Sequence, residues 1–182
     1  MTTERGFCVW LTGLSGAGKS TIAAALKQKL DAPGREVVVF DGDAVRSRLK
    51  TPLGFSREDR SANVRHVAEE AVTVVETAGI AICALMSPYA ESRHEARTLI
   101  GAERFVLVHV STPLAVCEGR DTKGLYGKAR RGEIHHVIGI DEAYEAPEDA
   151  DLRLDTTGSD VDAEVRAILG VLTRRALLSE PA

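Results

Sequence analysis

Short runs of apolar and often β-branched residues recur along the chain, separated by more polar stretches. The runs cover residues 7–11, 37–40, 80–85, 105–110 and, more weakly, 152–154. Uniformly apolar runs of this length are typical of buried strands, and helical patterns lie between most of them. Alternating strands and helices favour a parallel sheet covered on both faces. We therefore predict an α/β fold in three layers, with a mostly parallel five-stranded sheet flanked by helices.

Three amphipathic patterns predict helices between and after these strands. One begins near Lys19 and repeats apolar residues every four positions, and another covers residues 159–178. The longest covers residues 56–78, where Ser56 and Asp59 form a capping box. One turn before its apolar stripe, Arg60 and Asn63 fall on the same inward face, which indicates a pocket near the strand ends. Alternatively, these two side chains reach solvent or cap neighbouring groups.

Length and composition favour a single domain spanning residues 1–182, with 44% hydrophobic and 27% charged residues. The formal net charge of −4 argues against a nucleic-acid binder. Cys8, Cys83 and Cys117 lie far apart and are odd in number, which favours buried free thiols in a reducing compartment. Residues 1–5 carry no signal-type stretch, and no long apolar run occurs. We expect a cytoplasmic protein without a membrane segment.

Directly after the first apolar run, residues 13–21 read Gly-Leu-Ser-Gly-Ala-Gly-Lys-Ser-Thr, a complete phosphate-binding loop (P-loop). Its backbone N–H groups can surround the phosphates, Lys19 can reach the β- and γ-phosphate oxygens, and the Ser20 hydroxyl can hold Mg²⁺. The motif predicts that ATP and Mg²⁺ are cofactors. The candidate donor-binding residues are Gly13, Ser15, Gly16, Ala17, Gly18, Lys19, Ser20 and Thr21.

The region after the second apolar run indicates what receives the phosphate. A guanine-specific GTPase needs an Asn-Lys-x-Asp element, but the only Asn is Asn63, which Val64 follows. Residues 43–65 contain six Lys or Arg against three acids, an excess that points to an anionic acceptor in an acidic protein. Asp43, Arg46 and Arg60 are the strongest candidates, because a carboxylate can accept a hydroxyl proton and an arginine can hold an anion.

Residues 121–139 combine glycines with a dense basic cluster and show no strand pattern. Long segments of this kind are commonly functional, and small phosphotransferases close over their substrates to exclude water. We predict a mobile lid that carries Lys123, with Arg120 just before it. The alternative is a solvated, charged surface helix.

Over most of its length, the chain resembles the adenylylsulfate kinase family. The shared motifs are the P-loop, Asp41-Gly42-Asp43, residues 53–60, Ser87-Pro88-Tyr89, residues 121–126, and Gly139-Ile140-Asp141 with residues 144–148. The resemblance implies transfer of the ATP γ-phosphate to the 3′-hydroxyl of adenosine 5′-phosphosulfate, which forms 3′-phosphoadenosine 5′-phosphosulfate for sulfate assimilation. It also implies a P-loop kinase fold, a homodimer and a functional partnership with an ATP sulfurylase.

Site roles follow from the same resemblance. Asp43, Lys19 and Lys123 would be catalytic: Asp43 would act on the 3′-hydroxyl or on Mg²⁺, which Ser20 also holds, and Lys123 would cover the transferring phosphate. Arg120 would lie on the ATP side. The residues implied for the acceptor nucleotide, besides Asp43 and Lys123, are Arg46, Phe55, Arg60, Asn63, Ser87 and Val137, with Phe55 stacking on the adenine.

The chain departs from the family pattern at three positions near the acceptor. Val137 stands where the family has a phenylalanine that closes the adenine sandwich, Ala44 where Asn is usual, and Ala90 where Arg is common. These changes leave open an alternative acceptor, a related nucleotide with a different 5′-phosphate anhydride. A second alternative is a non-catalytic nucleotide-binding subunit.

Overall fold

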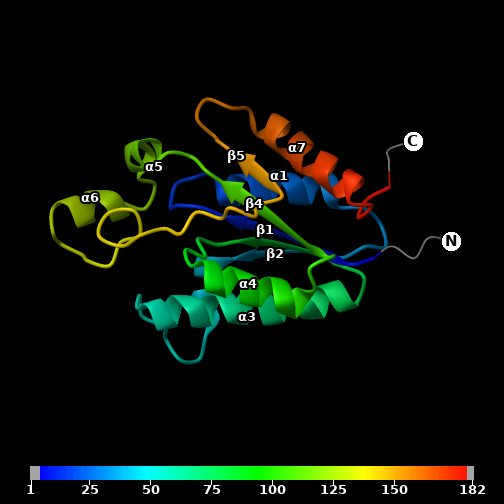
Figure 1. Cartoon of the computed structure of the whole chain (residues 1–182), viewed down its shortest axis with the longest axis horizontal. Helices are drawn as coiled ribbons and strands as arrows, with labels where there is room; N and C mark the ends of the chain where they lie inside the picture. Colours follow the sequence, from blue (N-terminus) through cyan, green and yellow to red (C-terminus); the bar gives the residue numbers. More distant parts are fainter. Residues whose placement is uncertain (1–4, 180–182) are drawn as a thin grey trace.

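The structure, a computed structural model, describes residues 5–179, and its centre is a five-stranded sheet (Figure 1). Residues 1–4, on which the expectation of no leader segment partly rests, and residues 180–182 lie outside the described residues. The strand order is β2-β3-β1-β4-β5, and all four neighbouring pairs are parallel. The strands are β1 (Phe7–Thr12), β2 (Val37–Asp41), β3 (Ile80–Ala84), β4 (Phe105–Val110) and β5 (Leu152–Leu154). The predicted sheet is confirmed.

Helices cover both faces of this sheet, which gives the three layers (Figure 1). Alternate residues of a strand point to opposite faces, so Val9 and Leu11 pack with α1 and α7, whereas Cys8 and Trp10 pack with α3 and α4. The helices are α1 (Lys19–Leu30), α2 (Gly42–Arg48), α3 (Arg57–Glu76), α4 (Ala90–Ile100), α5 (Leu114–Arg120), α6 (Leu125–Arg130) and α7 (Val161–Arg174).

Two helices are shorter than their patterns predict. Helix α3 begins as expected, because the Ser56 hydroxyl accepts a hydrogen bond from the Asp59 N–H. It ends at Glu76 rather than residue 78, since Ala78 has a φ of 63°, which is incompatible with a right-handed helix. Helix α7 begins only after Asp160, whose carboxylate caps it, and does not reach residue 178. The left-handed conformations of Ala78 after α3 and of Ala176, with a φ of 54°, after α7 are incompatible with continuing either helix.

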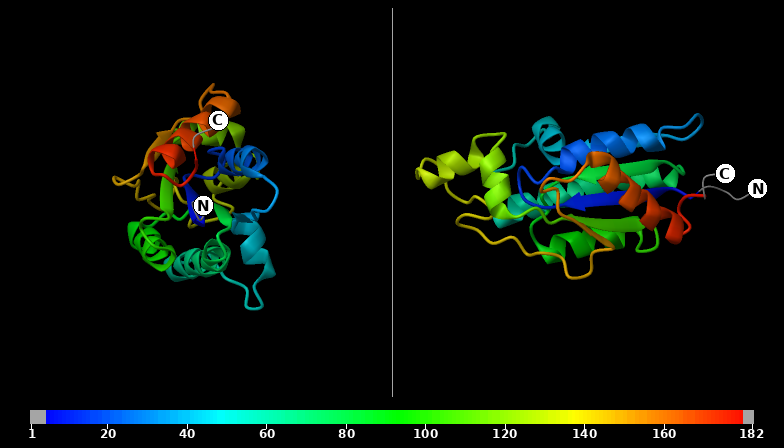
Figure 2. Two further views of the ribbon diagram at one scale, coloured as in Figure 1. Left: turned by 90° about the vertical axis from the view of Figure 1, so that its right-hand side faces the viewer. Right: turned by 90° about the horizontal axis from the view of Figure 1, so that it is seen from above.

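The lid segment, residues 121–139, contains more structure than predicted. Helix α6 forms part of it and lies with α5 beyond the edge where the strands end (Figure 2). The ring of Tyr126 is buried, and its hydroxyl donates to the carbonyl of Ser15 at 2.8 Å. Val137 and Ile138 are also buried. The segment is thus fastened to the P-loop through Tyr126 and buried at its other end, and its mobility stays a prediction.

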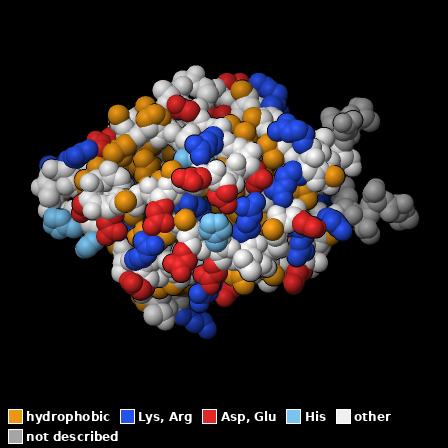
Figure 3. Space-filling view, viewed as in Figure 1, with side chains coloured by type: hydrophobic (Ala, Val, Ile, Leu, Met, Phe, Trp, Pro, Cys, Tyr) orange, Lys and Arg blue, Asp and Glu red, His pale blue; other side chains and the backbone are white. Residues whose placement is uncertain are grey.

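The remaining expectations concern surface and cysteines. On the face that Figure 3 shows, Lys and Arg side chains lie interspersed with Asp and Glu rather than in one basic patch. Cys8, Cys83 and Cys117 are buried free thiols, as predicted. No helix within residues 5–179 is long and apolar enough to cross a membrane.

Candidate active site

The P-loop connects β1 to α1 at the edge where the parallel strands end. Gly18 has a φ of 107°, and a Cβ there would lie 3.2 Å from Thr156 Cγ2, so glycine suits both the backbone conformation and the close approach of the loop to Thr156. A helix N-terminus with free N–H groups favours a bound anion. A cavity of about 960 Å³ lies over the loop and is also lined by α2, α3 and the lid. The topology thus brings most of the predicted site residues together.

Six of the predicted P-loop residues line this cavity: Ser15, Gly16, Gly18, Lys19, Ser20 and Thr21. Gly13 and Ala17 are buried and do not line it. The carbonyl of Ala17 accepts hydrogen bonds from the hydroxyls of Thr112 and Thr156, which hold the loop from behind. Gly13 and Ala17 therefore shape the backbone of the loop and offer no surface to the ligand.

Lys19 lies inside the loop, where its Nζ donates to the carbonyls of Gly13 at 2.8 Å and Leu14 at 2.7 Å. Burial lowers the pKa of Lys19 to about 8, and the positive charge of Lys123 lowers it further. The ammonium groups of Lys19 and Lys123 lie in one cavity beside the free N–H groups of the P-loop, which favours an anionic ligand even though Asp41 and Asp43 line the same cavity. Negative phosphate oxygens would stabilise the protonated form of Lys19 and raise its pKa again.

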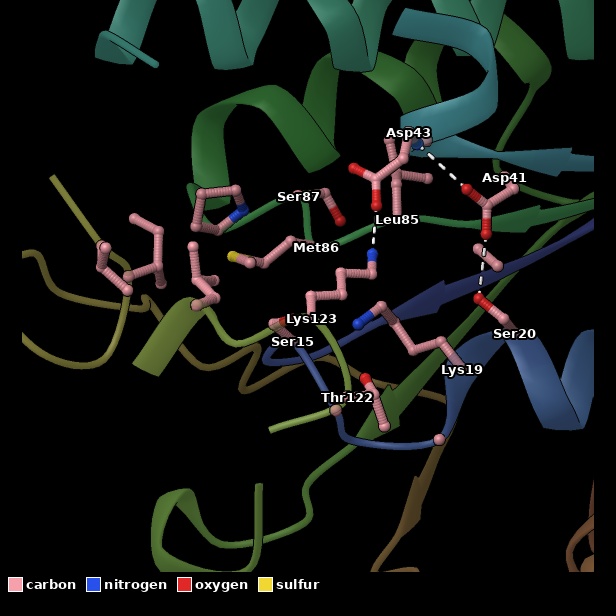
Figure 4. Close-up of a pocket in the computed structure, with 18 of the residues that line it drawn as sticks. Ser15, Lys19, Ser20, Asp41, Asp43, Leu85, Met86, Ser87, Thr122 and Lys123 are labelled. Carbon is pink, nitrogen blue, oxygen red and sulfur yellow. Dashed lines mark hydrogen bonds and ion pairs between the residues drawn. The ribbon is translucent and has the colours of Figure 1, made fainter. Parts of the chain in front are cut away.

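Ser20 pairs with Asp41 rather than with Asp43. The Ser20 hydroxyl donates to Asp41 Oδ2 at 2.9 Å, while Asp41 Oδ1 accepts from the N–H groups of Asp43 and Ala44 and caps α2 (Figure 4). The sequence assigned a metal to Ser20 and Asp43; the structure places Asp41 rather than Asp43 against Ser20, and the metal assignment stays a prediction. The available signal was the position of Asp41 as the last residue of β2, at the edge where the strand ends meet.

A hydroxyl and a carboxylate are oxygen ligands of the type that Mg²⁺ prefers. Ser20 and Asp41 therefore fit this ion, but two ligands do not complete its octahedral shell. Among the described residues there is no cluster of three or more His, Cys, Asp or Glu side chains that could hold a metal. A Mg²⁺ ion here needs phosphate oxygens and water as its other ligands.

Asp43 and Lys123 form an ion pair across the cavity (Figure 4). Asp43 lies in the first turn of α2, and Lys123 lies in the lid between α5 and α6. The two residues are 80 positions apart in the chain, and both side chains are largely exposed to the cavity. The lid thus delivers a cation to the carboxylate that the sequence indicated as catalytic.

The acceptor side of the cavity is built around Phe55, whose side chain is 61% exposed. The guanidinium groups of Arg46 and Arg60 lie over its ring, at 4.8 and 5.5 Å from the ring centroid. Burial lowers the pKa of Arg46, and the neighbouring charge of Arg60 lowers it further. A flat ring beside two cations suits a ligand that combines a base with anionic groups.

Arg60 and Asn63 both face this cavity, which confirms the inward orientation that the α3 pattern predicts. Arg60 donates to the carbonyls of Phe55 and His136, so it connects α3 to the lid. Asn63 is buried and donates to the carbonyl of Gly42 at 3.4 Å, but its Oδ1 atom is buried without a hydrogen-bond partner. A buried amide oxygen without a partner is costly, and a ligand donor would satisfy it.

A family profile described as adenylylsulphate kinase matches residues 5–155. The adenylyl-sulfate kinase of Phocaeicola vulgatus is 49% identical over 166 residues, covering 91% of this chain and 81% of that protein. The adenylyl-sulfate kinase of Paraburkholderia xenovorans is 45% identical, with 98% and 99% covered. The APS kinase CysC of Mycobacterium tuberculosis, solved in complex with AMPPNP and APS, superimposes with a TM-score of 0.86 at 41% identity, with 92% and 98% covered.

The chain belongs to the adenylylsulphate kinase family. In this member of the family, Arg120 is an exposed residue whose guanidinium is held on the P-loop side. Its guanidinium donates to the carbonyl of Gly16 at 3.0 Å and to the hydroxyl and carbonyl of Thr156, each at 2.8 Å. Arg120 also lines the cavity, together with Ser159 and Glu164 of the segment after β5, for which the sequence offered no signal.

Two acceptor residues implied by the resemblance differ in how they are presented to the cavity. Val137 is buried and lines the cavity at the end of the lid, where its N–H donates to Asp141. Ser87 also lines it, but its hydroxyl is occupied by Trp10 and Thr12. In this adenylylsulphate kinase, therefore, Ser87 offers backbone rather than a hydroxyl to a ligand.

Proposed function

We propose that this chain catalyses transfer of the ATP γ-phosphate to the 3′-hydroxyl of adenosine 5′-phosphosulfate. The observation that carries the proposal is the pairing of Asp43 with Lys123 in a cavity that has a P-loop on one side and Phe55 with its two arginines on the other. Membership of the adenylylsulphate kinase family supports the reaction. The related CysC structure, which contains AMPPNP and APS, supports the two-nucleotide arrangement.

On the donor side, the P-loop and Lys19 hold the phosphates of ATP, and Arg120 borders the remainder of the nucleotide. Ser20 and Asp41, which are hydrogen-bonded to each other, would supply two oxygen ligands for Mg²⁺. When bound, this ion neutralises charge on the β- and γ-phosphates. Phosphoryl transfer depends mostly on positioning and charge neutralisation, so these few groups are enough to support it.

On the acceptor side, Phe55 stacks on the adenine while Arg46 and Arg60 hold the phosphosulfate group. Asn63 Oδ1 accepts a hydrogen bond from the nucleotide, which removes its unpaired buried state. The backbone around Ser87 and the side chain of Val137 complete the pocket. Each residue that the family resemblance implies for the acceptor nucleotide lines the cavity and has a role in this assignment.

During transfer, Asp43 accepts the proton of the 3′-hydroxyl as the oxygen attacks the γ-phosphorus. The new bond joins the 3′-oxygen to phosphorus, and the bond between phosphorus and the β–γ bridging oxygen breaks. Lys19 and Lys123 neutralise the negative charge that builds on the transferred phosphoryl group and on ADP. Asp43 then releases its proton to water.

A coupled assay of ADP release tests this proposal. We expect turnover that depends on adenosine 5′-phosphosulfate and is much lower with AMP or unrelated nucleotides. Equal turnover with all acceptors would refute the substrate assignment. ATP binding without any acceptor-dependent ADP release would favour the non-catalytic subunit.

The alternative acceptor, a nucleotide with another 5′-phosphate anhydride, draws support from Val137, Ala44 and Ala90. Ala44 offers only a methyl group beside Asp43, and the N–H of Ala90 is already bound to Glu145. A panel of adenosine 5′-phosphate anhydrides in the same assay separates the two acceptors. We also propose that the chain forms a homodimer, works in the cytoplasm and receives its acceptor from an ATP sulfurylase.

A further inference from the structure

The segment 86–88, which forms the acceptor-side wall of the cavity, contains a strained residue. Ser87 has a φ of 38°, in the left-handed region that residues with a Cβ rarely adopt. Such conformations persist only where surrounding contacts impose them, and they concentrate at functional sites. Figure 4 shows Met86 and Ser87 on the side of the cavity opposite Lys19. The contacts that impose this conformation therefore shape the acceptor side.

A chain of buried hydrogen bonds holds the Ser87 side chain. The indole N–H of Trp10 donates to Ser87 Oγ at 3.1 Å, and Ser87 Oγ donates to Thr12 Oγ1 at 2.9 Å. Thr12 Oγ1 in turn donates to the carbonyl of Met86 at 2.6 Å. Because Thr12 has only one hydroxyl proton, the 2.9 Å contact between Thr12 Oγ1 and the Tyr144 hydroxyl must be donated by Tyr144.

Tyr144 thus completes the hydrogen bonds of Thr12, and it does so from a distant part of the chain. It lies 132 positions after Thr12, and its ring stacks on His109, with ring centroids 5.7 Å apart. The single proton of Thr12 is directed at backbone carbonyls, that of Met86 at 2.6 Å and, at the longer distance of 3.4 Å, that of Ser87, so Thr12 Oγ1 acts toward Tyr144 as an acceptor. Loss of the Tyr144 hydroxyl would leave Thr12 Oγ1 with one donor fewer inside the protein.

The next residue of the same motif, Glu145, fastens the backbone on the other side of Ser87. Its N–H donates to the carbonyl of Pro88 at 2.9 Å, and its carboxylate accepts from the N–H of Ala90 at 2.7 Å. The buried guanidinium of Arg93 bridges the two segments, donating to the carbonyls of Ser87 at 2.7 Å and Glu145 at 2.6 Å. The 86–90 segment is therefore bound to the chain at Tyr144 and Glu145 from both directions.

The geometry also explains why the acceptor side, rather than the ATP side, depends on this arrangement. Leu85 packs directly on Gly42, where a Cβ would lie only 2.6 Å from Leu85 Cβ. Gly42 immediately precedes Asp43 and receives the hydrogen bond of Asn63. A shift of the 85–88 segment would thus displace the acceptor residues. Arg120, on the donor side, is instead the last residue of α5 and is held by the P-loop carbonyl of Gly16 and by Thr156, which follows β5.

We propose that Tyr144, acting through Thr12 and Ser87, is a positioning residue that sets the acceptor side of this kinase site. The inference rests on the proposed function for the identity of the acceptor. Tyr144 itself does not line the cavity, so its effect passes entirely through the 86–88 backbone.

The test compares Tyr144→Phe with Tyr89→Phe. Tyr144→Phe keeps the ring against His109 and removes only the hydroxyl. Tyr89→Phe is a matched control, because Tyr89 is also buried and its hydroxyl donates to Glu142 at 3.3 Å instead of to the Thr12 network. We expect Tyr144→Phe to raise KM for adenosine 5′-phosphosulfate about three- to tenfold, with KM for ATP changed by less than about twofold. Tyr89→Phe should leave both constants unchanged.

A second pair of variants examines the middle of the chain of hydrogen bonds. Thr12→Val removes the hydroxyl that accepts hydrogen bonds from the Tyr144 and Ser87 hydroxyls, whereas Thr12→Ser retains it. We expect Thr12→Val to raise the acceptor KM at least as much as Tyr144→Phe, and Thr12→Ser to restore it. If Thr12→Val does not fold, Tyr144→Phe alone decides.

Equal rises in both KM values, or a Tyr89→Phe effect as large as that of Tyr144→Phe, would overturn the positioning role. A purely structural defect would lower the active fraction, and hence the apparent kcat, without a selective change in the acceptor KM. If the unchanged chain shows no turnover with adenosine 5′-phosphosulfate, the proposed function fails. Calorimetric titration of that nucleotide into wild type and Tyr144→Phe in the presence of ADP then decides the positioning role, since equal affinities would refute it.

Discussion

His109 is the basis of a quantitative prediction about stability and pH. It lies in β4, is 7% exposed, and its Nδ1 atom is buried without a hydrogen-bond partner. Burial lowers the pKa of His109 from the usual 6.5 to about 4, and the positive charges of Arg153 and Arg93 lower it in the same direction. The folded protein therefore keeps this ring neutral over a pH range in which the unfolded chain protonates it.

This difference in pKa determines how the free energy of unfolding changes with pH. Because the folded pKa lies below the unfolded pKa, the stabilisation is fully present above pH 6.5 and is lost as pH falls toward 4. Each pKa unit corresponds to about 1.4 kcal/mol, so the full loss is about 3 kcal/mol. At about pH 5 the loss already reaches about 2 kcal/mol. That amount is a large fraction of the stability of a typical domain.

Urea unfolding at about pH 7.5 and about pH 5 measures this loss. The variant His109→Phe retains a ring against Tyr144 but cannot titrate, so its free energy of unfolding should fall by about 2 kcal/mol less than that of the wild type between these two conditions. Carboxylates such as Asp141, whose pKa is lowered by backbone N–H groups, contribute equally to both proteins and cancel. Parallel pH dependence in wild type and His109→Phe would refute the reasoning.

Three further predictions concern catalysis. Asp43→Ala should lower kcat by about two to four orders of magnitude with ATP affinity nearly unchanged, because Asp43 acts on the acceptor proton; an equal loss of ATP affinity, measured by calorimetry, would place Asp43 in the donor site instead. Asp41→Asn keeps the α2 cap but weakens a Mg²⁺ ligand, so the Mg²⁺ concentration for half-maximal rate should rise about tenfold. The same titration of Asp43→Ala should give the wild-type midpoint. The reverse pattern would indicate that Asp43, and not Asp41, binds the metal. Val137→Phe should tighten binding of adenosine 5′-phosphosulfate up to about tenfold through ring stacking, with Val137→Leu as the control for added volume; an unchanged affinity would favour the alternative acceptor.

Much of the fold was predictable because its signals are local. The five strands were each recognisable from a short apolar run, and the Ser56 cap located the start of α3. The ends of α3 and α7 were not, since they depend on the left-handed conformation of Ala78 and on the capping of α7 by Asp160. A helix in the lid entered only as the alternative of a charged surface helix, because glycines and charges conceal the six-residue α6, which Tyr126 stabilises by burial.

The candidate site divides in the same way. The P-loop, Arg60 and Asn63 were predictable because motif spacing and helical periodicity determine where neighbouring side chains point. The pairing of Ser20 with Asp41 was not predictable, because it depends on how two strand ends meet. Nor did the sequence reveal that the Ser87 hydroxyl is occupied from within the protein.

By itself, then, the amino-acid sequence determined the layers of the fold, the phosphate-binding loop and the residues that could hold an anionic acceptor. Only the tertiary structure decided which carboxylate meets Ser20, that Lys123 reaches Asp43 from the lid, and that Tyr144 supports Thr12. Periodicity and motif spacing act over a few residues, where the backbone geometry is known in advance. Contacts such as that between Thr12 and Tyr144 join residues 132 positions apart, and they exist only once the sheet has brought its strand ends together.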